Sequence, residues 1–322
     1  MHSISRRGLV ISAAAAGAAY GLDGPLEFIA PAFAQQANNG FAKFTVGDAK
    51  VTTIFDGVFE KPHDAGFIKN ASIDETKAAL KAGGITDDFV PITFTITVVE
   101  LGGKTIMFDS GTGGGQAGGP KAGMLAKENL AKAGIDPAKI STIVMTHFHG
   151  DHIFGLMAKD TNAQVYPNAE ILVPEAEYKF WTDEGVIAKL DPGRAGLAKR
   201  IQATFPIWKN VKQIGDGKDA IAGVRSINTN GHTPGHTSYA VGSGGLIVSG
   251  DVTNIAALFV KNPDWQAVVD QDGPLAAKNR RALFERIISE KSVVTGYHWG
   301  MPGAGTLQKD GNGYALVPVS AA

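Results

Sequence analysis

The stretch His147-Phe148-His149-Gly150-Asp151-His152 places four potential metal ligands within six consecutive residues. It follows residues 140–146, an apolar run that predicts a buried strand ending directly before His147. In a loop after a strand, this spacing can turn His147 and His149 toward one metal while Asp151 and His152 face a second. Chance clustering or a purely structural role is a poor explanation for so many ligand-type residues packed this closely.

Three further ligand-type side chains each follow a short apolar run later in the chain. They are His232, Asp251 and His298, which follow residues 222–229, 246–249 and 292–295. Because strands hold the loops at their ends in fixed positions, we expect these side chains to meet the first loop in one cleft. We expect His232 to complete the first site, His298 to complete the second, and the Asp251 carboxylate to bridge the two cations.

The composition restricts both the metal and the partners. The chain contains no Cys, which leaves imidazole and carboxylate groups as ligands. These groups suit Zn²⁺ best, and Fe, Mn and Co are also compatible. With 30 Lys plus Arg against 31 Asp plus Glu, the formal net charge is -1. No excess of positive charge is available to neutralise a phosphate backbone, so we expect no nucleic-acid partner.

The rest of the sequence alternates short strands with helical stretches, as expected of an α/β protein. Residues 93–99 and 105–109 predict a β-hairpin with Gly102 and Gly103 in its turn. Residues 121–133 have helical spacing and end before Gly134. Residues 174–212 predict a helical insertion whose aromatic side chains either pack into the core or form a lid or pocket wall.

Two polar residues near the ligands are expected to support them without binding metal. Asp109 ends its strand and is expected to orient the metal loop through backbone hydrogen bonds. His236 lies four residues after His232 and is expected to hold the ligands in position without binding metal itself.

Residues 1–34 predict an export signal. Ser5-Arg6-Arg7-Gly8 precedes a modest apolar run at 11–19, and Ala32-Phe33-Ala34 ends the segment. This layout is typical of a twin-arginine signal cut after Ala34, which predicts a periplasmic or secreted mature chain of residues 35–322. An ordinary amphipathic helix and a membrane anchor are the alternatives, and Gly17 and Gly21 interrupt the run too early for a stable membrane span.

Together the motifs resemble the metallo-β-lactamase superfamily in its dinuclear hydrolase branch. The resemblance covers residues 45–318 and rests on the His147 run, Gly231-His232-Thr233-Pro234-Gly235-His236, Ser249-Gly250-Asp251 and Tyr297-His298. It implies a single α/β domain with a four-layer αβ/βα sandwich and the metals at the rim of two facing sheets. A narrower resemblance to methyl parathion hydrolase and N-acyl homoserine lactonases rests on Met145-Thr146-His147, Trp181 and residues 313–319. Relatives of this kind are often dimers, which suggests a homodimer.

Three positions distinguish the chain within that resemblance. Many homoserine-lactone lactonases place a tyrosine three residues after the bridging aspartate, where this chain has Asn254. Class B β-lactamases that share the first motif lack a bridging aspartate, so Asp251 argues against antibiotic hydrolysis. Flavodiiron relatives typically carry glutamate where this chain has His149, which argues against oxygen reduction.

The resemblance implies a hydrolase in which a hydroxide shared by two divalent cations attacks a lactone, another carboxyl ester or an organophosphate triester. Asp151 or Asp251 would shuttle the proton to the leaving group as the catalytic carboxylate. A single-iron persulfide dioxygenase and a glyoxalase II-like thioesterase are alternative enzymes on the same fold. A metal-binding protein without catalytic activity is a further alternative.

Overall fold

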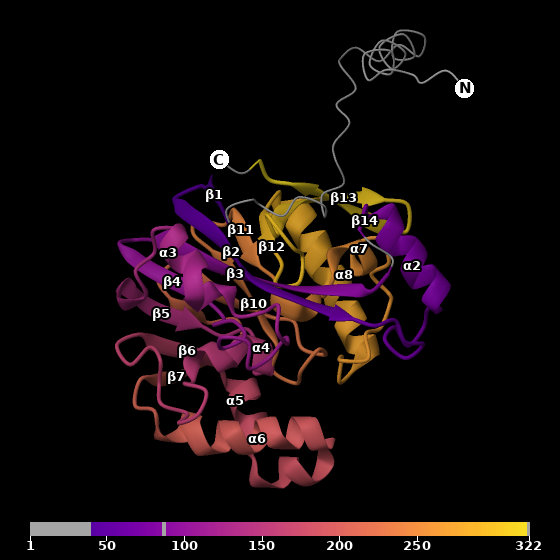
Figure 1. Cartoon of the computed structure of the whole chain (residues 1–322). Helices are drawn as coiled ribbons and strands as arrows, with labels where there is room; N and C mark the ends of the chain where they lie inside the picture. The colour runs from indigo at the N-terminus through magenta and orange to yellow at the C-terminus, as the bar shows by residue number, and fades with distance from the viewer. Residues whose placement is uncertain (1–39, 86–87, 321–322) are drawn as a thin grey trace, which may run out of the picture.

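The computed structural model of the chain describes residues 40–85 and 88–320, and the predicted export signal at 1–34 lies outside these residues. Two seven-stranded sheets form the body of the molecule (Figure 1). The strands are β1 (Phe41–Val46), β2 (Ala49–Lys61), β3 (Val90–Leu101), β4 (Lys104–Phe108), β5 (Ile140–Val144), β6 (Glu170–Pro174), β7 (Val211–Ile214), β8 (Asp219–Ile221), β9 (Val224–Asn228), β10 (Thr237–Val241), β11 (Leu246–Val248), β12 (Val293–Thr295), β13 (Ala304–Asp310) and β14 (Gly313–Pro318).

Helices connect these strands and cover the outer faces of the sheets. The α-helices are α2 (Ile73–Ala82), α3 (Leu130–Lys132), α4 (Gly150–Ile153), α5 (Glu175–Thr182), α6 (Pro192–Thr204), α7 (Ala256–Phe259) and α8 (Gly273–Glu290). The short non-α turns are η1 (Leu125–Asn129), η2 (Pro137–Lys139), η3 (Phe154–Leu156), η4 (Glu184–Lys189), η5 (Phe205–Ile207) and η6 (Gly250–Val252). Among the described residues, no helix combines the length and the apolar character that crossing a bilayer would require.

Each sheet mixes antiparallel and parallel pairs. The first has the order β1-β2-β3-β4-β5-β6-β7, antiparallel up to β4 and parallel from β4 to β7. The second has the order β14-β13-β12-β11-β10-β9-β8, in which only β11 and β12 run parallel. The carboxyl ends of β5 and β12 lead directly into the segments that carry His147 and His298.

The apolar side chains divide the molecule into four layers. Val99 and Phe108 of the first sheet meet Tyr239 and Val248 of the second in the core between the sheets. Because side chains alternate along a strand, the neighbouring positions face outward and need a helical cover. On the second sheet α8 supplies that cover through Phe284. The α/β fold and the four-layer sandwich predicted from the sequence are therefore confirmed.

The outer face of the first sheet packs against helices from two parts of the chain. Ile143 of β5 shares a cluster with Leu130 of α3 and with Trp181 and Phe205 of residues 174–212. That segment contains α5 and α6, which lie together at the lower end of the view in Figure 1. The sequence allows two roles for the aromatic side chains of this segment, packing into the core or forming a lid or pocket wall. Trp181 and Phe205 pack into the core.

The predicted hairpin is confirmed, whereas the predicted helix is shorter than expected. β3 and β4 pair antiparallel, and Gly102 and Gly103 between them both have positive φ. The helical segment starts at Leu125 instead of residue 121, because Ala122 forms a bridge with Gly57 of β2. The Leu125 N–H then donates to the Asp56 carboxylate at 2.6 Å, which anchors the first helical turn to β2.

Candidate metal centre

The loop that carries the first ligands is held by Asp109 at the end of β4. One Asp109 carboxylate oxygen accepts the Thr146 N–H at 2.8 Å, and the other accepts the Thr146 hydroxyl at 2.8 Å. The second oxygen also lies 2.9 Å from His152 Nδ1. Asp109 therefore orients the loop through a backbone hydrogen bond, as predicted, and it also fixes the ring of one candidate ligand.

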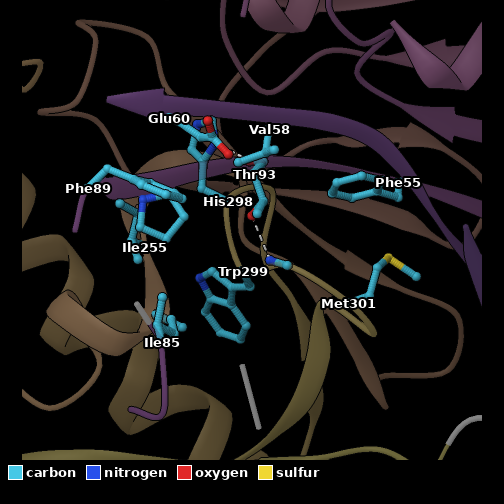
Figure 2. A pocket seen from close by; sticks show the side chains of 13 residues that line it. Phe55, Val58, Glu60, Ile85, Phe89, Thr93, Ile255, His298, Trp299 and Met301 are labelled. Carbon is cyan, nitrogen blue, oxygen red and sulfur yellow. Dashed lines mark hydrogen bonds between the residues drawn. The ribbon is translucent and has the colours of Figure 1, made fainter. Parts of the chain in front are cut away.

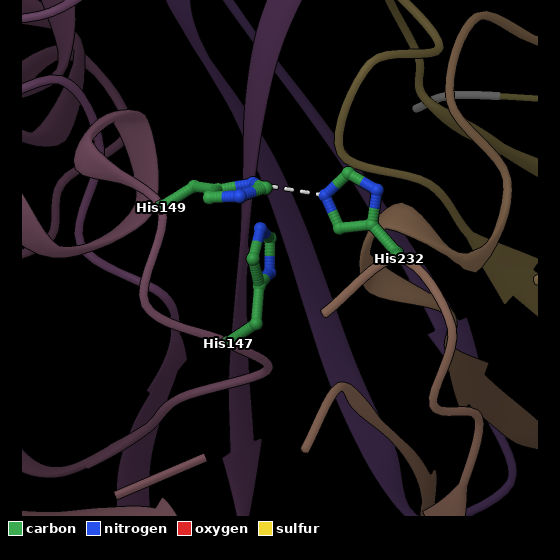
Figure 3. A group of neighbouring side chains, drawn as sticks. All are labelled: His147, His149 and His232. Atoms are coloured by element: carbon green, nitrogen blue, oxygen red, sulfur yellow. Dashed lines mark hydrogen bonds between the residues drawn. The ribbon is translucent and has the colours of Figure 1, made fainter. Parts of the chain in front are cut away.

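The first ligand group consists of three imidazoles that face one another (Figure 3). The ring centroids of His147 and His149 lie 4.6 Å apart, and each lies within 4.8 Å of the His232 centroid. His149 Nδ1 lies 2.9 Å from His232 Nε2. His232 comes from the loop between β9 and β10 in the second sheet, so the group spans both halves of the sandwich.

The second ligand group combines carboxylate and imidazole. One Asp151 oxygen lies 3.6 Å from both His152 Nε2 and His298 Nε2. Asp151 and His152 belong to α4, whereas His298 follows β12. The structure thus brings together the three residues that the sequence assigned to the second site.

Asp251 lies between the two groups. One of its oxygens is 2.9 Å from His298 Nε2 and 3.5 Å from His232 Nε2. Its other oxygen lies 3.5 Å from His152 Nε2. One carboxylate therefore contacts ligands of both groups, which is the placement that a bridging role requires.

The outer nitrogens of the histidines are tied to the protein, so that the inner nitrogens face the cluster. Nδ1 of His147 contacts the Thr146 hydroxyl, and Nδ1 of His298 lies 2.7 Å from the Thr93 carbonyl oxygen. These hydrogen bonds leave Nε2 of His147 and of His298 as the available ligand atom, whereas His149 turns its Nδ1 toward His232.

Three buried polar atoms in the cluster have no hydrogen-bond partner within the described part of the chain: His147 Nε2, His152 Nε2 and Asp251 Oδ1. An unsatisfied buried polar group costs about 1–3 kcal/mol, so such atoms rarely occur together without a reason. Lone pairs of imidazole and carboxylate that converge in a buried space are the donor set of a divalent cation site. The residues present therefore fit divalent metal ions.

The ionisation of the two groups differs. Burial, with added repulsion from neighbouring imidazoles, lowers the pKa of His147 and His149 well below the usual value. Burial, the largest single influence, would also lower the pKa of His152 and His298, but the nearby carboxylates, Asp251 foremost, together outweigh it and raise the pKa of both. Burial therefore favours the neutral form of His147 and His149, whereas the carboxylates favour the protonated form of His152 and His298.

Two supporting residues escape sequence analysis because their partners lie far away in the chain. Asp270 accepts from His232 Nδ1 at 2.9 Å, and Arg280 of α8 lies 3.6 Å from Asp270. The fully buried Arg280 also donates to the carbonyl oxygen of Val252, the residue after Asp251, at 2.7 Å. Neither residue has a motif around it, so only the fold reveals their positions behind His232 and Asp251.

His236 supports the bridging carboxylate from behind, as expected. Its Nε2 accepts the Asp251 N–H at 2.9 Å, while its Nδ1 contacts Thr229. Gly250 has a φ of +58, and a Cβ there would lie 2.7 Å from His236 Nε2. Glycine at this position therefore permits both the backbone turn and the close approach of the histidine.

A cavity of about 220 Å³ opens on the cluster. The charged and polar side of its lining is formed by His149, Asp151, His232, Asp251, Asn254 and His298, and the apolar side by Phe59, Phe67, Ile92, Phe94, Ala117 and Val269, with Gly118 beside them. The Asn254 side-chain oxygen accepts the Ile255 N–H at 3.0 Å, which fixes the orientation of this amide.

A second cavity of about 220 Å³ lies on the other side of His298 (Figure 2). Pro91 and Thr93 of β3 line it, whereas Ile92 and Phe94 line the first cavity, as the alternation of side chains along a strand requires. The Thr93 hydroxyl accepts the Gly300 N–H at 2.8 Å, which holds the segment after His298 against β3.

Comparisons with known proteins agree with this geometry. The chain is 26% identical over 168 residues to an N-acyl homoserine lactonase of Bacillus sp, a match that covers 51% of this chain and 58% of that protein. The chain spans about half the length of the curated relatives it matches, 44% and 58%. The solved hydrolase AbOPH of the beta lactamase superfamily is 26% identical with a TM-score of 0.79, and the match covers 88% of this chain and 98% of AbOPH.

AidC, described as a dizinc quorum-quenching lactonase and solved with a product bound, is 25% identical with a TM-score of 0.76. The match again covers 88% of this chain and 98% of AidC. The sequence model of the metallo-beta-lactamase superfamily matches residues 95–286, more than half of the chain and including six of the seven predicted ligands. The chain belongs to the metallo-beta-lactamase superfamily.

Proposed function

We propose that the chain is a metal-dependent hydrolase of a lactone or another neutral carboxyl ester. The observation that carries this proposal is the position of Asp251, between two ligand groups at one side of a cavity whose other side is apolar. Lactonases among the similar proteins support the ester class. An aryl phosphotriester is the alternative substrate, because it also presents a neutral electrophile.

We propose the same division of ligands that the sequence analysis predicts. His147, His149 and His232 would hold one cation, Asp151, His152 and His298 would hold the other, and Asp251 lies between the two groups. When bound, divalent cations supply Lewis acidity and lower the pKa of water from 15.7 toward about 7. We propose Zn²⁺ as the metal, and Fe, Mn and Co suit the same ligand types.

The protein groups orient this site and move the proton. Asp109 and Asp270 hold the rings of His152 and His232 in fixed orientations. Asp151 is the more exposed of the two cluster carboxylates and lines the cavity, which suits it to pass a proton to the leaving group. Asp251, fully buried between the histidines, serves mainly to hold the two ligand groups at a fixed separation.

The cavity favours a neutral substrate with an apolar arm. Every ionisable side chain in its lining belongs to the proposed ligand set, so no further charged side chain is left to pair with a charged group on the substrate. Phe59, Phe67 and Phe94 offer an aromatic wall for an acyl or aryl group, and their packing against that group excludes water from the reacting bond.

The test is metal quantitation on the purified mature chain together with a panel of a lactone, a carboxyl ester, a thioester and an aryl phosphotriester. We expect two divalent metals per chain, the highest kcat/KM on the lactone or ester, and loss of turnover with a chelator. A higher kcat/KM on the phosphotriester would reassign the substrate. One iron per chain together with oxygen uptake would show that the chain is a dioxygenase instead of a hydrolase.

We also propose that residues 1–34 export the chain by the twin-arginine route to the periplasm or the medium. The Arg6-Arg7 pair and the Ala32-Phe33-Ala34 ending support this. Replacing both arginines with lysine should retain the full-length chain in the cytoplasm, as measured by cell fractionation and mass of the purified protein. An unchanged mature mass beginning after Ala34 would contradict the proposed signal.

A further inference from the structure

Glu177, near the start of residues 174–212, is a fully buried carboxylate that accepts four hydrogen bonds. One oxygen accepts the Phe148 N–H at 2.9 Å and the Trp181 indole N–H at 2.7 Å. The other accepts the Thr233 hydroxyl at 2.7 Å and the Gly235 N–H at 2.9 Å. Each carboxylate oxygen therefore makes two contacts, and all four partners are donors.

The donors come from the two loops that form the first ligand group. Phe148 lies between His147 and His149, and Thr233 follows His232 directly. One oxygen of Glu177 therefore contacts the loop of the first sheet, and the other contacts the loop of the second sheet. Because the carboxylate is planar and rigid, it fixes the separation of the two loops.

The loop of the second sheet also approaches the backbone of α5 closely. A Cβ added to Gly235 would lie 2.0 Å from the Glu177 nitrogen. Only glycine permits this approach, which brings the Gly235 N–H within reach of the carboxylate. The loop and the helix therefore fit each other at this point.

The four donors around Glu177 require a side chain with several acceptor positions. Burial raises the pKa of Glu177 because it disfavours the charged form, and the four hydrogen bonds act in the opposite direction. An apolar side chain of similar size would leave all four donors without an acceptor, at a cost of about 1–3 kcal/mol for each. The carboxylate instead provides four acceptor positions in one plane, at fixed distances from both loops.

We propose that Glu177 is a positioning residue that sets the geometry of the His147, His149 and His232 group, and that the segment 174–212 contributes it. The proposal goes beyond the proposed function, because it assigns this segment a role in cation affinity that holds whatever the substrate is. Its test is therefore a metal-binding measurement, which can fail or succeed independently of ester hydrolysis.

The decisive variant is Glu177→Gln, which keeps the shape but places an amide NH₂ against two donors. Metal-free full-length mature protein is titrated with Co²⁺ and Zn²⁺, and His149→Ala and His298→Ala proteins identify which binding step belongs to which group. We expect the affinity of the first group for the cation to fall about 10–100-fold, which is the usual effect of losing a residue that supports the metal ligands. The Co²⁺ absorption spectrum should also change. The second group should keep its affinity.

The matched control is Glu175→Gln, two residues earlier on the same helix, where the glutamate is exposed and paired with Lys179. This protein should bind both cations as the unchanged chain does. Unchanged affinities in Glu177→Gln, or equal losses at both groups, would overturn the proposal.

A second pair of variants decides the question if Glu177→Gln does not fold. Thr233→Val and Trp181→Phe each remove one of the four donors, but only Thr233 belongs to a ligand-bearing loop. We expect Thr233→Val to lower the affinity of the first group about tenfold, as expected for one hydrogen bond to a charged group, and Trp181→Phe to leave it unchanged. The same loss in both variants would show that Glu177 only stabilises α5 and would refute the positioning role.

Discussion

The two ligand groups differ in how the protein compensates their burial. In the first, neighbouring histidines stay neutral, because burial and mutual repulsion lower the pKa of His147 and His149. In the second, charges of opposite sign are paired. The pKa of Asp251 would be raised by burial, but His298 and His152 hold it well below its usual value.

This difference indicates how each group responds to a cation. Neutral imidazoles offer free lone pairs, so His147 and His149 are ready to bind a cation without losing a proton. In the second group the carboxylates raise the pKa of His152 and His298, so an incoming cation competes with protons there. The positions of the nitrogen atoms therefore favour cation binding in the first group, and the negative charge of the carboxylates favours it in the second. Asp251 contacts both groups.

Removing the shared carboxylate should have the largest effect. In Asp251→Asn we expect about one metal per chain instead of two and a fall in kcat of about 10²–10³-fold, because one Lewis-acidic centre is lost. Metal analysis by mass spectrometry and turnover on the best ester substrate measure both changes. Asp264→Asn, at an exposed acid paired with Arg281, is the control and should change neither. Two metals and unchanged turnover in Asp251→Asn would refute the bridging role.

The sequence predicts the ligand loop well, because its ligands are neighbours in the chain. A strand that ends at residue 144 leaves little freedom for His147 and His149, so local spacing determines where they point. His232 and His298 are predictable for a similar reason, since each follows a short strand in the second sheet. The motif order also predicts the layers, since both sheets must deliver their loops to one rim.

The supporting residues could not be predicted, since they depend on contacts between distant parts of the chain. Glu177 reaches Phe148 across 29 positions, and Asp270 reaches His232 across 38. A glutamate on a short helix and an aspartate in a loop carry no local pattern that indicates a buried partner. The start of the helix near Leu125 was mispredicted for the same reason, because a bridge to Gly57 occupies the preceding residues.

The next prediction concerns Arg280 and Asp270, which hold His232 of the first group in position. In Arg280→Met the buried Asp270 loses its counter-charge, and the carbonyl oxygens of Val252, Pro263 and Trp265 lose their donor. We expect the free energy of unfolding to fall by about 3–5 kcal/mol, the usual cost of breaking a buried ion pair. Urea denaturation of the metal-free protein measures this loss.

The neighbouring Arg281 provides a matched comparison on the same helix. It pairs with Asp264 at the surface, so Arg281→Met should cost only about 0–1 kcal/mol. Equal losses in the two variants would mean that the buried contacts of Arg280 contribute no more than an exposed ion pair.

The smallest expected effect is a difference in proton release. Since the pKa of His152 and His298 is raised in the metal-free protein, protons compete with the cation for both residues. The affinity of the second group should therefore rise about tenfold per pH unit for each proton released. His147 and His149 are already neutral, so their deprotonation should add no such slope to the first group above about pH 6.5. Calorimetric titration in two buffers with different heats of ionisation counts the protons, and His298→Ala should release fewer. Equal proton release at both steps would remove the contrast between the two groups.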